Sequence, residues 1–436
     1  MELNLSAQQS AALDHLESGE NIFLTGGAGS GKSFLIRHFM TTLNTKTWPL
    51  LASTGAAAVL VGGRTFHSFF SLGIMEGGFD PTFNRALKDG KMHKRLREAE
   101  GLVIDEVSMI PGEALQVAEA LARASRQSSL PWGGLRIIAV GDFAQLPPVT
   151  RTGQRDWCFL TETWRDSGFT KVELTHNQRV SENVFLDVLQ DVRYGQVTER
   201  VKEFLNQHVK PHDEMDPATR LFPRKDQSEF FNQKKLQEIS DKEHVIDSIY
   251  LGEARYVQSL AKSAPVGEKL VLKKNCRVMF LQNDPQQRWV NGTRGIVTGI
   301  EPDKIRVRKE YPHKQENNLP SFGREITVEK TQFSMQDSEG KVVASVIQFP
   351  LGLAYATTIH KSQGSTLDSL WCDLSRLWEP GHAYVALSRL TSAAGLNLIS
   401  WSPRSIIVDP KVVQFYQSSQ VRGSFYDEEN RQSDWS

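Results

Sequence analysis

The octet GGAGSGKS at residues 26–33 decides the fold class of this chain. It satisfies the pattern G-x-x-x-x-G-K-[ST], in which backbone N–H groups of a glycine-rich turn surround a phosphate and the following helix adds its positive end. An apolar run at 22–24 precedes the octet, and apolar residues recur at helical spacing between 34 and 43. Because a strand, a glycine turn and a helix follow in this order, the stretch predicts a nucleoside-triphosphate site.

The residues of the octet have separate expected roles. Lys32 would reach the β- and γ-phosphates, and the Ser33 hydroxyl would bind Mg²⁺. The backbone cradle around the phosphates would come from Gly26, Gly27, Ala28, Gly29, Ser30 and Gly31.

Composition limits the class of protein. The 436 residues are long enough for roughly two to four domains, and no apolar stretch approaches the ~20 residues of a membrane span. The three cysteines form no CxxC pair, which favours a reducing cytoplasm and no metal cluster. A net charge of zero argues against an architectural nucleic-acid binder, yet it allows a local basic groove.

The first third of the chain alternates apolar strand candidates with helical stretches. The candidates lie at 22–25, 50–54, 102–105 and 137–141, which favours a mostly parallel sheet. Between 62 and 97, a segment rich in glycine and aromatic residues and then a basic run interrupt this pattern and indicate an insertion.

From 185 to 201 a helical pattern resumes, and a strand, a loop and a helix are expected from about residue 221 onward. Short strand candidates at 277–281, 295–300, 304–308, 325–329 and 342–348 then predict a small β-barrel or curled sheet inserted into an α/β domain. After α/β patterning returns, residues 417–436 are polar and expected to fray.

Two further motifs point to hydrolysis. LVIDE at 102–106 is an apolar strand ending in two acids, of which Asp105 is expected to hold the metal and Glu106 to act as general base. GDFAQLPP at 141–148 follows another apolar strand, and the Gln145 amide suits a γ-phosphate sensor because it can donate and accept at once. Up to this point a kinase, a GTPase or a motor would fit equally well.

The C-terminal part separates these possibilities. ATTIHKSQG at 356–364 mixes hydroxyl, histidine, lysine and amide groups, and AYVALSR at 383–389 ends in Arg389. An arginine supplied by a second domain can neutralise γ-phosphate charge in the transition state, an effect of ~10³–10⁵ in rate. Hydrolysis would then depend on domain closure, as in a motor.

In this order the motifs resemble those of superfamily-one DNA helicases, and within them the Pif family of 5′→3′ helicases. The resemblance spans most of residues 3–400. It rests on GGAGSGKS, LVIDEVSM, GDFAQLPP, PLGLAYATTIHKSQGSTLD and PGHAYVALSR, with TGAAAVLVGGRTFHSF as an early DNA-contacting motif. The chain departs from the family's usual residues at Ser30, Pro111 and His382.

The resemblance implies an α/β fold with two RecA-like P-loop NTPase domains, ATP in the cleft between them and single-stranded DNA across both. It places the first RecA-like domain at 1–62 and 98–175, a wedge insertion at 63–97, and the second RecA-like domain at 176–290 and 346–416. An inserted Src-homology-three-like β-barrel is expected at 291–345 and a polar tail at 417–436.

The resemblance also assigns roles to single residues. Gln9 would read the adenine, and Arg179 and Arg389 would be the two arginine fingers of the second domain. Lys32, Ser33, Asp105, Glu106 and Gln145 keep the roles argued above. The expected DNA contacts are Thr54, Gly55, His67, Phe69, Thr358, His360 and Lys361. For Phe69, simple packing of the insertion is an equal alternative to stacking on a base.

The expected activity is ATP- and Mg²⁺-dependent unwinding of duplex or structured DNA in genome maintenance, with forks, G-quadruplexes and RNA–DNA hybrids as possible substrates. The expected partners are single-stranded DNA and its junctions with duplex. A cytoplasmic monomer is expected, with oligomerisation on DNA left open.

Three alternatives remain. A RecD- or Dda-like helicase of the same polarity would fit the chain length equally well, although the LGLAYATTIHKSQG run and the signature-like stretch at 107–126 favour Pif. A nucleotide kinase or metabolic ATPase would leave the motifs at 356–389 unexplained. A non-motor DNA clamp would not need the Asp105-Glu106 pair.

Overall fold

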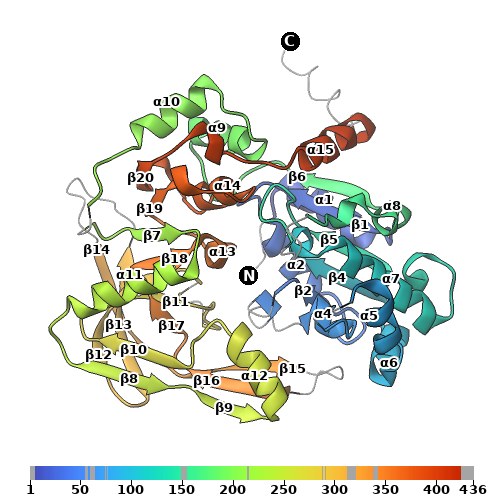
Figure 1. The fold of residues 1–436 in the computed structure, drawn as a ribbon, viewed down its shortest axis with the longest axis horizontal. Coiled ribbons are helices and arrows are strands. Elements are labelled where there is room, and N and C mark those ends of the chain that lie inside the picture. Colours follow the sequence, from blue (N-terminus) through green and yellow to red (C-terminus); the bar gives the residue numbers. More distant parts are fainter. Residues whose placement is uncertain are drawn as a thin grey trace.

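The computed structural model describes residues 5–54, 57–58, 64–73, 75, 77–148, 155–213, 216–286, 288–289, 291–311, 321–336 and 342–423. Three bodies of regular structure are visible in Figure 1: a first α/β half, a second α/β half and a β-rich unit. No helix of the described residues is both long and apolar enough to span a bilayer.

The first half is built on a six-stranded sheet in the order β3-β2-β4-β5-β1-β6, in which every pairing is parallel. Its strands are β1 (Ile22–Gly26), β2 (Leu50–Ala52), β3 (Arg64–Thr65), β4 (Gly101–Asp105), β5 (Arg136–Val140) and β6 (Thr170–Leu174). Its helices are α1 (Ala7–Glu17), α2 (Lys32–Met40), α4 (Phe66–Phe69), α5 (Phe79–Ala86), α6 (Gly90–Glu98), α7 (Gly112–Arg126) and α8 (Glu162–Asp166). The four strands expected in this region are confirmed, with ends shifted by one or two residues.

The central strands of this sheet are apolar throughout because both of their faces are covered. Successive side chains point to opposite faces. Phe23 therefore joins a core with residues of α7, whereas Ile22 and Leu24 join a second core with Leu35 of α2. This two-sided burial fixes the carboxyl ends of β1, β4 and β5 along one edge of the sheet, where the acids and the glycine turn follow.

The second half is built on a four-stranded parallel sheet in the order β18-β7-β19-β20. Its strands are β7 (Thr219–Phe222), β18 (Ala356–Thr358), β19 (Leu370–Asp373) and β20 (Leu396–Ser400). Its helices are α9 (Asn183–Arg193), α10 (Glu199–Gln207), α11 (Lys225–Gln237), α13 (Ile359–Ser362) and α14 (His382–Leu387). The helical pattern expected over 185–201 resolves into α9 and the start of α10.

The five strand candidates between 277 and 348 are confirmed, but the β-rich unit is larger than the inserted barrel at 291–345 that the resemblance implies. A five-stranded antiparallel sheet runs β14-β13-β12-β11-β17, next to a three-stranded sheet β15-β16-β9 and a pair β10-β8. The elements are β8 (Glu243–Asp247), β9 (Ile249–Gly252), α12 (Ala254–Ser263), β10 (Lys269–Lys273), β11 (Arg277–Phe280), β12 (Arg294–Ile300), β13 (Lys304–Tyr311), β14 (Ser321–Glu329), β15 (Thr331–Gln336), β16 (Val342–Gln348) and β17 (Leu351–Leu353). Strands flanking 291–345 thus complete the sheets, and closure into a barrel stays a prediction.

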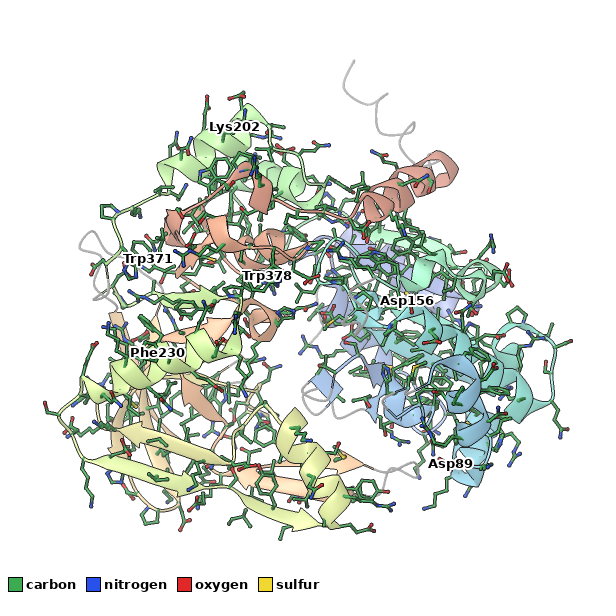
Figure 2. The ribbon with its side chains drawn as sticks, in the orientation of Figure 1. Asp89, Asp156, Lys202, Phe230, Trp371 and Trp378 are labelled. Carbon is green, nitrogen blue, oxygen red and sulfur yellow. The ribbon has the colours of Figure 1, made fainter. Side chains whose placement is uncertain are left out.

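Two segments lie differently from the sequence-based division. The aromatic residues of the expected wedge, including Phe66, Phe69 and Phe70, belong to the same core as the first sheet. Asp89, whose side chain caps the start of α6, lies at the edge of the first half (Figure 2). Helix α15 (Pro410–Gly423) packs on the first half, because its Val412 and Tyr416 belong to that core. The expectation of a frayed tail from 417 onward was wrong for 417–423, which continue this helix.

Candidate nucleotide and DNA site

The phosphate loop connects β1 to α2. Gly31 caps α2 with φ of 92°, and a Cβ atom there would lie 2.5 Å from the Gln9 Nε2 atom. The positive φ therefore favours glycine at this position, and a larger residue would also have to displace the Gln9 amide. The neighbouring Ser30 hydroxyl is buried and has no hydrogen-bond partner among the described residues. A buried, unsatisfied donor beside the N-terminus of a helix is a suitable contact for an anion.

Lys32 turns back onto its own loop. Its Nζ atom donates to the carbonyl oxygens of Gly26, at 2.7 Å, and Gly27, at 3.1 Å. Burial lowers the pKa of Lys32, and the charges of Asp142 and Glu106 oppose this shift. A phosphate is a stronger partner than two neutral carbonyls, so the ammonium group is available to an anionic ligand.

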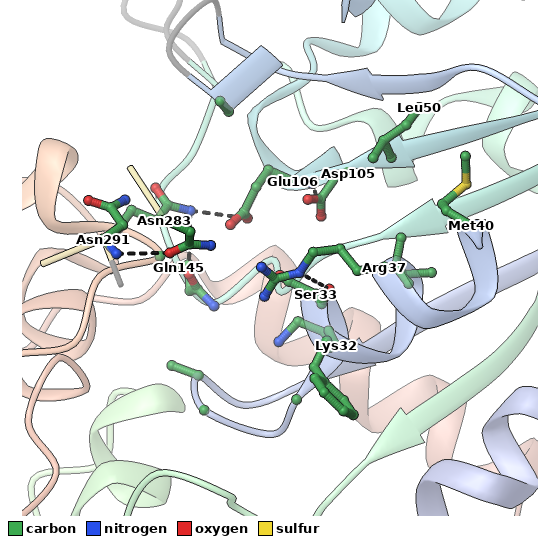
Figure 3. A pocket seen from close by; sticks show the side chains of 18 of the residues that line it. Lys32, Ser33, Arg37, Met40, Leu50, Asp105, Glu106, Gln145, Asn283 and Asn291 are labelled. Atoms are coloured by element: carbon green, nitrogen blue, oxygen red, sulfur yellow. Dashed lines mark hydrogen bonds between the residues drawn. The ribbon is translucent and has the colours of Figure 1, made fainter. Parts of the chain in front are cut away.

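The two acids lie at the carboxyl end of β4. Asp105 Oδ1 accepts a hydrogen bond from the Glu106 backbone N–H at 2.9 Å, and Glu106 has the left-handed φ of 51°. Burial, followed by the charge of Asp105, raises the pKa of Glu106 to about 7. Figure 3 shows Lys32, Asp105, Glu106 and Gln145 around one pocket. A carboxylate with such a pKa is suited to accepting a proton from water.

Both expected finger arginines are close to this pocket. Arg179 follows the end of β6, next to the phosphate loop, and its guanidinium donates to the Ser388 carbonyl. Arg389 lies just after α14, is 2% exposed, and donates to the carbonyls of Val385 at 2.8 Å and Ser362 at 3.3 Å. Burial and the nearby Arg179 lower the pKa of Arg389 to about 9. A buried cation held only by neutral acceptors is ready to exchange them for a phosphate.

A single cavity of about 1370 Å³ brings these groups together from both halves. The residues expected at the nucleotide that line it are Ala28, Gly29, Gly31, Lys32, Ser33, Asp105, Glu106, Gln145, Arg179 and Arg389. Gln9 is buried beside it, where its Oε1 atom accepts from the Ser6 N–H in a capping box at the start of α1. Reading of adenine by Gln9 stays a prediction.

Three functional candidates were missed by the sequence. Gln363 donates to Glu106 and Gln145, and the Tyr384 hydroxyl accepts the Ala28 N–H at 2.7 Å. Arg193 of α9 forms a buried ion pair with Asp142 at 3.1 Å. All three residues belong to motifs or helices that the sequence indicated. The hydrogen bonds of Gln363 and Tyr384 join residues 218 to 356 positions apart, and the Arg193–Asp142 ion pair joins residues 51 positions apart. No local sequence pattern encodes such pairings.

The expected DNA contacts fall into two groups. Thr358 caps α13 by accepting the Lys361 N–H at 3.1 Å, and the side chains of His360 and Lys361 are exposed there. In the first half, Thr54 accepts the Ala57 N–H at 3.2 Å, and His67 is half-buried. Gly55 lies outside the described residues.

Phe69 is 3% exposed and packs against Phe70, with the guanidinium groups of Arg64 and Arg95 over its ring. Its ring therefore has no open face for a base in this conformation, and the packing alternative fits its position better than stacking does.

Comparison with known proteins gives a consistent result. The profile of the PIF1-like helicase family matches residues 4–203. The ATP-dependent DNA helicase Pif1 of Bdellovibrio bacteriovorus is 66% identical over 416 residues, covering 95% of this chain and 92% of that protein. Bacteroides sp Pif1 in complex with ADP-AlF4 has a TM-score of 0.83 at 29% identity, and Bacteroides Pif1 bound to ssDNA has a TM-score of 0.66 at 28% identity. Each covers 97% of this chain and 98% of that structure.

The ADP-AlF4 complex matches the fold over nearly the whole chain, and the parallel sheets are those of RecA-like domains. The Bdellovibrio protein matches the sequence over a similar extent. The chain belongs to the PIF1-like helicase family.

Proposed function

We propose that this protein is an ATP-dependent DNA helicase that translocates 5′→3′ on single-stranded DNA and unwinds duplex or structured DNA. The observation that carries the proposal is the shared cavity, in which the phosphate loop and acids of the first half face an arginine of the second. Hydrolysis at such a site is sensitive to the position of the two halves, which is what a translocating motor requires.

The residues present fit ATP and Mg²⁺. The glycine turn, the unsatisfied Ser30 hydroxyl and the Lys32 ammonium suit the phosphates. Ser33 and Asp105 line the same cavity and supply hydroxyl and carboxylate oxygens, the ligands that Mg²⁺ prefers. When bound, the metal neutralises charge on the phosphate oxygens.

The chain's own residues then have distinct tasks. Glu106 accepts the proton of the attacking water, and Gln145 orients the reacting groups by hydrogen bonds. Lys32 exchanges the Gly26 and Gly27 carbonyls for phosphate oxygens. Arg389 leaves the Ser362 carbonyl to stabilise charge at the γ-phosphate.

For DNA we propose the end of α13, where the exposed His360 and Lys361 would contact the phosphate backbone beside the buried Thr358, which would take part only at the edge of the contact. The partners proposed are single-stranded DNA and its junctions with duplex, bound by a monomer. That Bacteroides Pif1 has been solved bound to ssDNA supports this choice. A cytoplasmic location is proposed from the three free, buried cysteines, Cys158, Cys276 and Cys372.

A strand-displacement assay tests the polarity. Two duplexes of the same sequence, one with a 5′ and one with a 3′ single-stranded tail, are incubated with protein, ATP and Mg²⁺. Unwinding is expected only from the 5′ tail. Unwinding only from the 3′ tail would overturn the polarity, and ATP turnover without unwinding of either duplex would favour a non-helicase ATPase.

A further inference from the structure

Gln363 makes a side-chain contact between the two halves at the catalytic acid. Its Nε2 atom donates to Oε2 of Glu106 at 3.1 Å and to Oε1 of Gln145 at 3.3 Å. Gln363 belongs to the second half, while Glu106 and Gln145 follow strands β4 and β5 of the first. One amide therefore contacts both the proposed general base and the proposed γ-phosphate sensor across the cavity.

Gln363 is also the C-cap residue of α13, the short helix that carries the proposed DNA contacts. Its backbone N–H donates to the His360 carbonyl at 3.2 Å, and the Thr358 hydroxyl caps the other end of the same turn. Because both ends of α13 are bonded within a single turn, we expect the helix to move as a unit. A displacement of Lys361 by a DNA phosphate would then be transmitted to Gln363.

Arg389 holds the same turn from the nucleotide side. Its Nη1 atom donates to the carbonyls of Ser362, at 3.3 Å, and Ser365, at 3.5 Å, on either side of Gln363. The guanidinium cannot keep both contacts and also reach a phosphate. Arg389 must therefore release these carbonyls if it moves to a bound phosphate, and a change of this kind at the turn is what coupling between two sites requires.

We propose that Gln363 is a positioning residue that couples DNA binding at α13 to the general base Glu106. Its side chain lines the cavity and contacts Glu106 and Gln145 directly. It acts by orienting Glu106 and Gln145 according to the position of α13. This inference rests on the proposed helicase function and adds to it the route by which DNA stimulates hydrolysis.

The test compares Gln363→Met with wild-type protein. Methionine keeps the unbranched length and removes the amide. We expect the ratio of ssDNA-saturated to DNA-free ATP turnover to fall about tenfold or more, the range expected for a lost hydrogen bond to a charged group. The KM for ATP and the Kd for a fluorescent oligonucleotide should stay within about twofold, since the phosphate and DNA contacts proposed above are made by other residues.

Gln348→Met is the matched control. The buried Gln348 amide donates to the Ile246 carbonyl and to the Ser248 hydroxyl, each at 3.0 Å, inside the β-rich unit. Its loss removes the same chemical group at a distance from the cavity, and the stimulation ratio should not change. Gln363→Glu should reduce the ratio at least as strongly as Gln363→Met, because it places a second acid against Glu106.

Two results would overturn the inference. A Gln363→Met protein with the wild-type ratio would show that the contact carries no coupling. If the stimulation ratio falls, the KM for ATP rises and the affinity for the oligonucleotide falls together, the residue only maintains the fold. If the wild-type protein itself shows no stimulation by DNA, the helicase function fails first, which is a different outcome from either.

Discussion

At the scale of single residues, the charged side chains of the site form hydrogen bonds that a ligand must replace. Lys32 donates to the Gly26 and Gly27 carbonyls, Arg389 donates to backbone carbonyls, and the Glu106 carboxylate accepts from the Gln363 amide. Each charged group is thus satisfied before any ligand arrives, because an unpaired buried charge would be costly. The two cations, Lys32 and Arg389, can also exchange their neutral carbonyl partners for a charged phosphate.

Glu106→Gln tests the assignment of the base. The substitution keeps the size of the side chain and removes the proton acceptor, so ATP turnover is expected to fall by ~10²–10⁴. Binding of ADP, followed with a fluorescent analogue, should remain close to that of wild type. Turnover within about threefold of wild type would exclude Glu106 as the general base.

At the scale of elements, α15 is the unexpected component. Tyr416 is 1% exposed, its hydroxyl accepts the Phe143 N–H at 3.0 Å, and it lies 3.1 Å from Asp142 Oδ1. The helix therefore stabilises, through Tyr416, the loop that begins at the end of β5 and leads to Gln145. A C-terminal helix of the chain supports the nucleotide site from the side of the first sheet.

Tyr416→Ala should destabilise the protein by about 3–5 kcal/mol, the range measured for loss of a large buried aromatic side chain. Thermal melting checks this, and the exposed Phe230, on α11, provides the control, since Phe230→Ala should change stability by less than ~0.5 kcal/mol. Equal melting of the two variants would contradict the packing of α15 on the first half.

At the scale of the whole molecule, the two halves meet through buried polar contacts as well as the cavity. Arg193 of α9 pairs with Asp142 at 3.1 Å, and both side chains are almost fully buried. The pair lowers the pKa of Asp142 against the opposing effect of burial, which is the larger single influence. The contact fixes α9 against the carboxyl end of β5 and so sets the distance between the halves.

Removing one partner of this pair leaves the other charge buried and alone. Arg193→Met is therefore expected to cost about 3–5 kcal/mol, measured by thermal or urea unfolding. The double variant Arg193→Met with Asp142→Asn should be more stable than Arg193→Met alone. If the loss of unfolding free energy in the double variant equals the sum of the losses in Arg193→Met and Asp142→Asn, the two residues do not interact.

The parts of the fold and site that could be predicted from the sequence are those that depend on residues close together in the chain. The phosphate loop, the acids after β4 and the parallel strands are encoded by neighbouring residues, and the structure has them at the expected positions. The position of α15, the addition of β8, β9, β10 and β17 to the β-rich unit, and the Gln363 contact depend on residues distant in the chain. Phe69 shows the same limit, because an aromatic side chain in a short helix has the same local pattern whether it packs or binds a base.

We propose that the two halves share the nucleotide site and that DNA controls their closure. The decisive measurement is ATP turnover with and without a saturating single-stranded oligonucleotide, in wild type and Arg389→Ala. We expect strong stimulation of wild type by DNA, and a fall of ~10³-fold or more in the stimulated rate of Arg389→Ala, with ADP binding retained. Fast turnover that ignores DNA, or full stimulation of the Arg389→Ala protein, would contradict it.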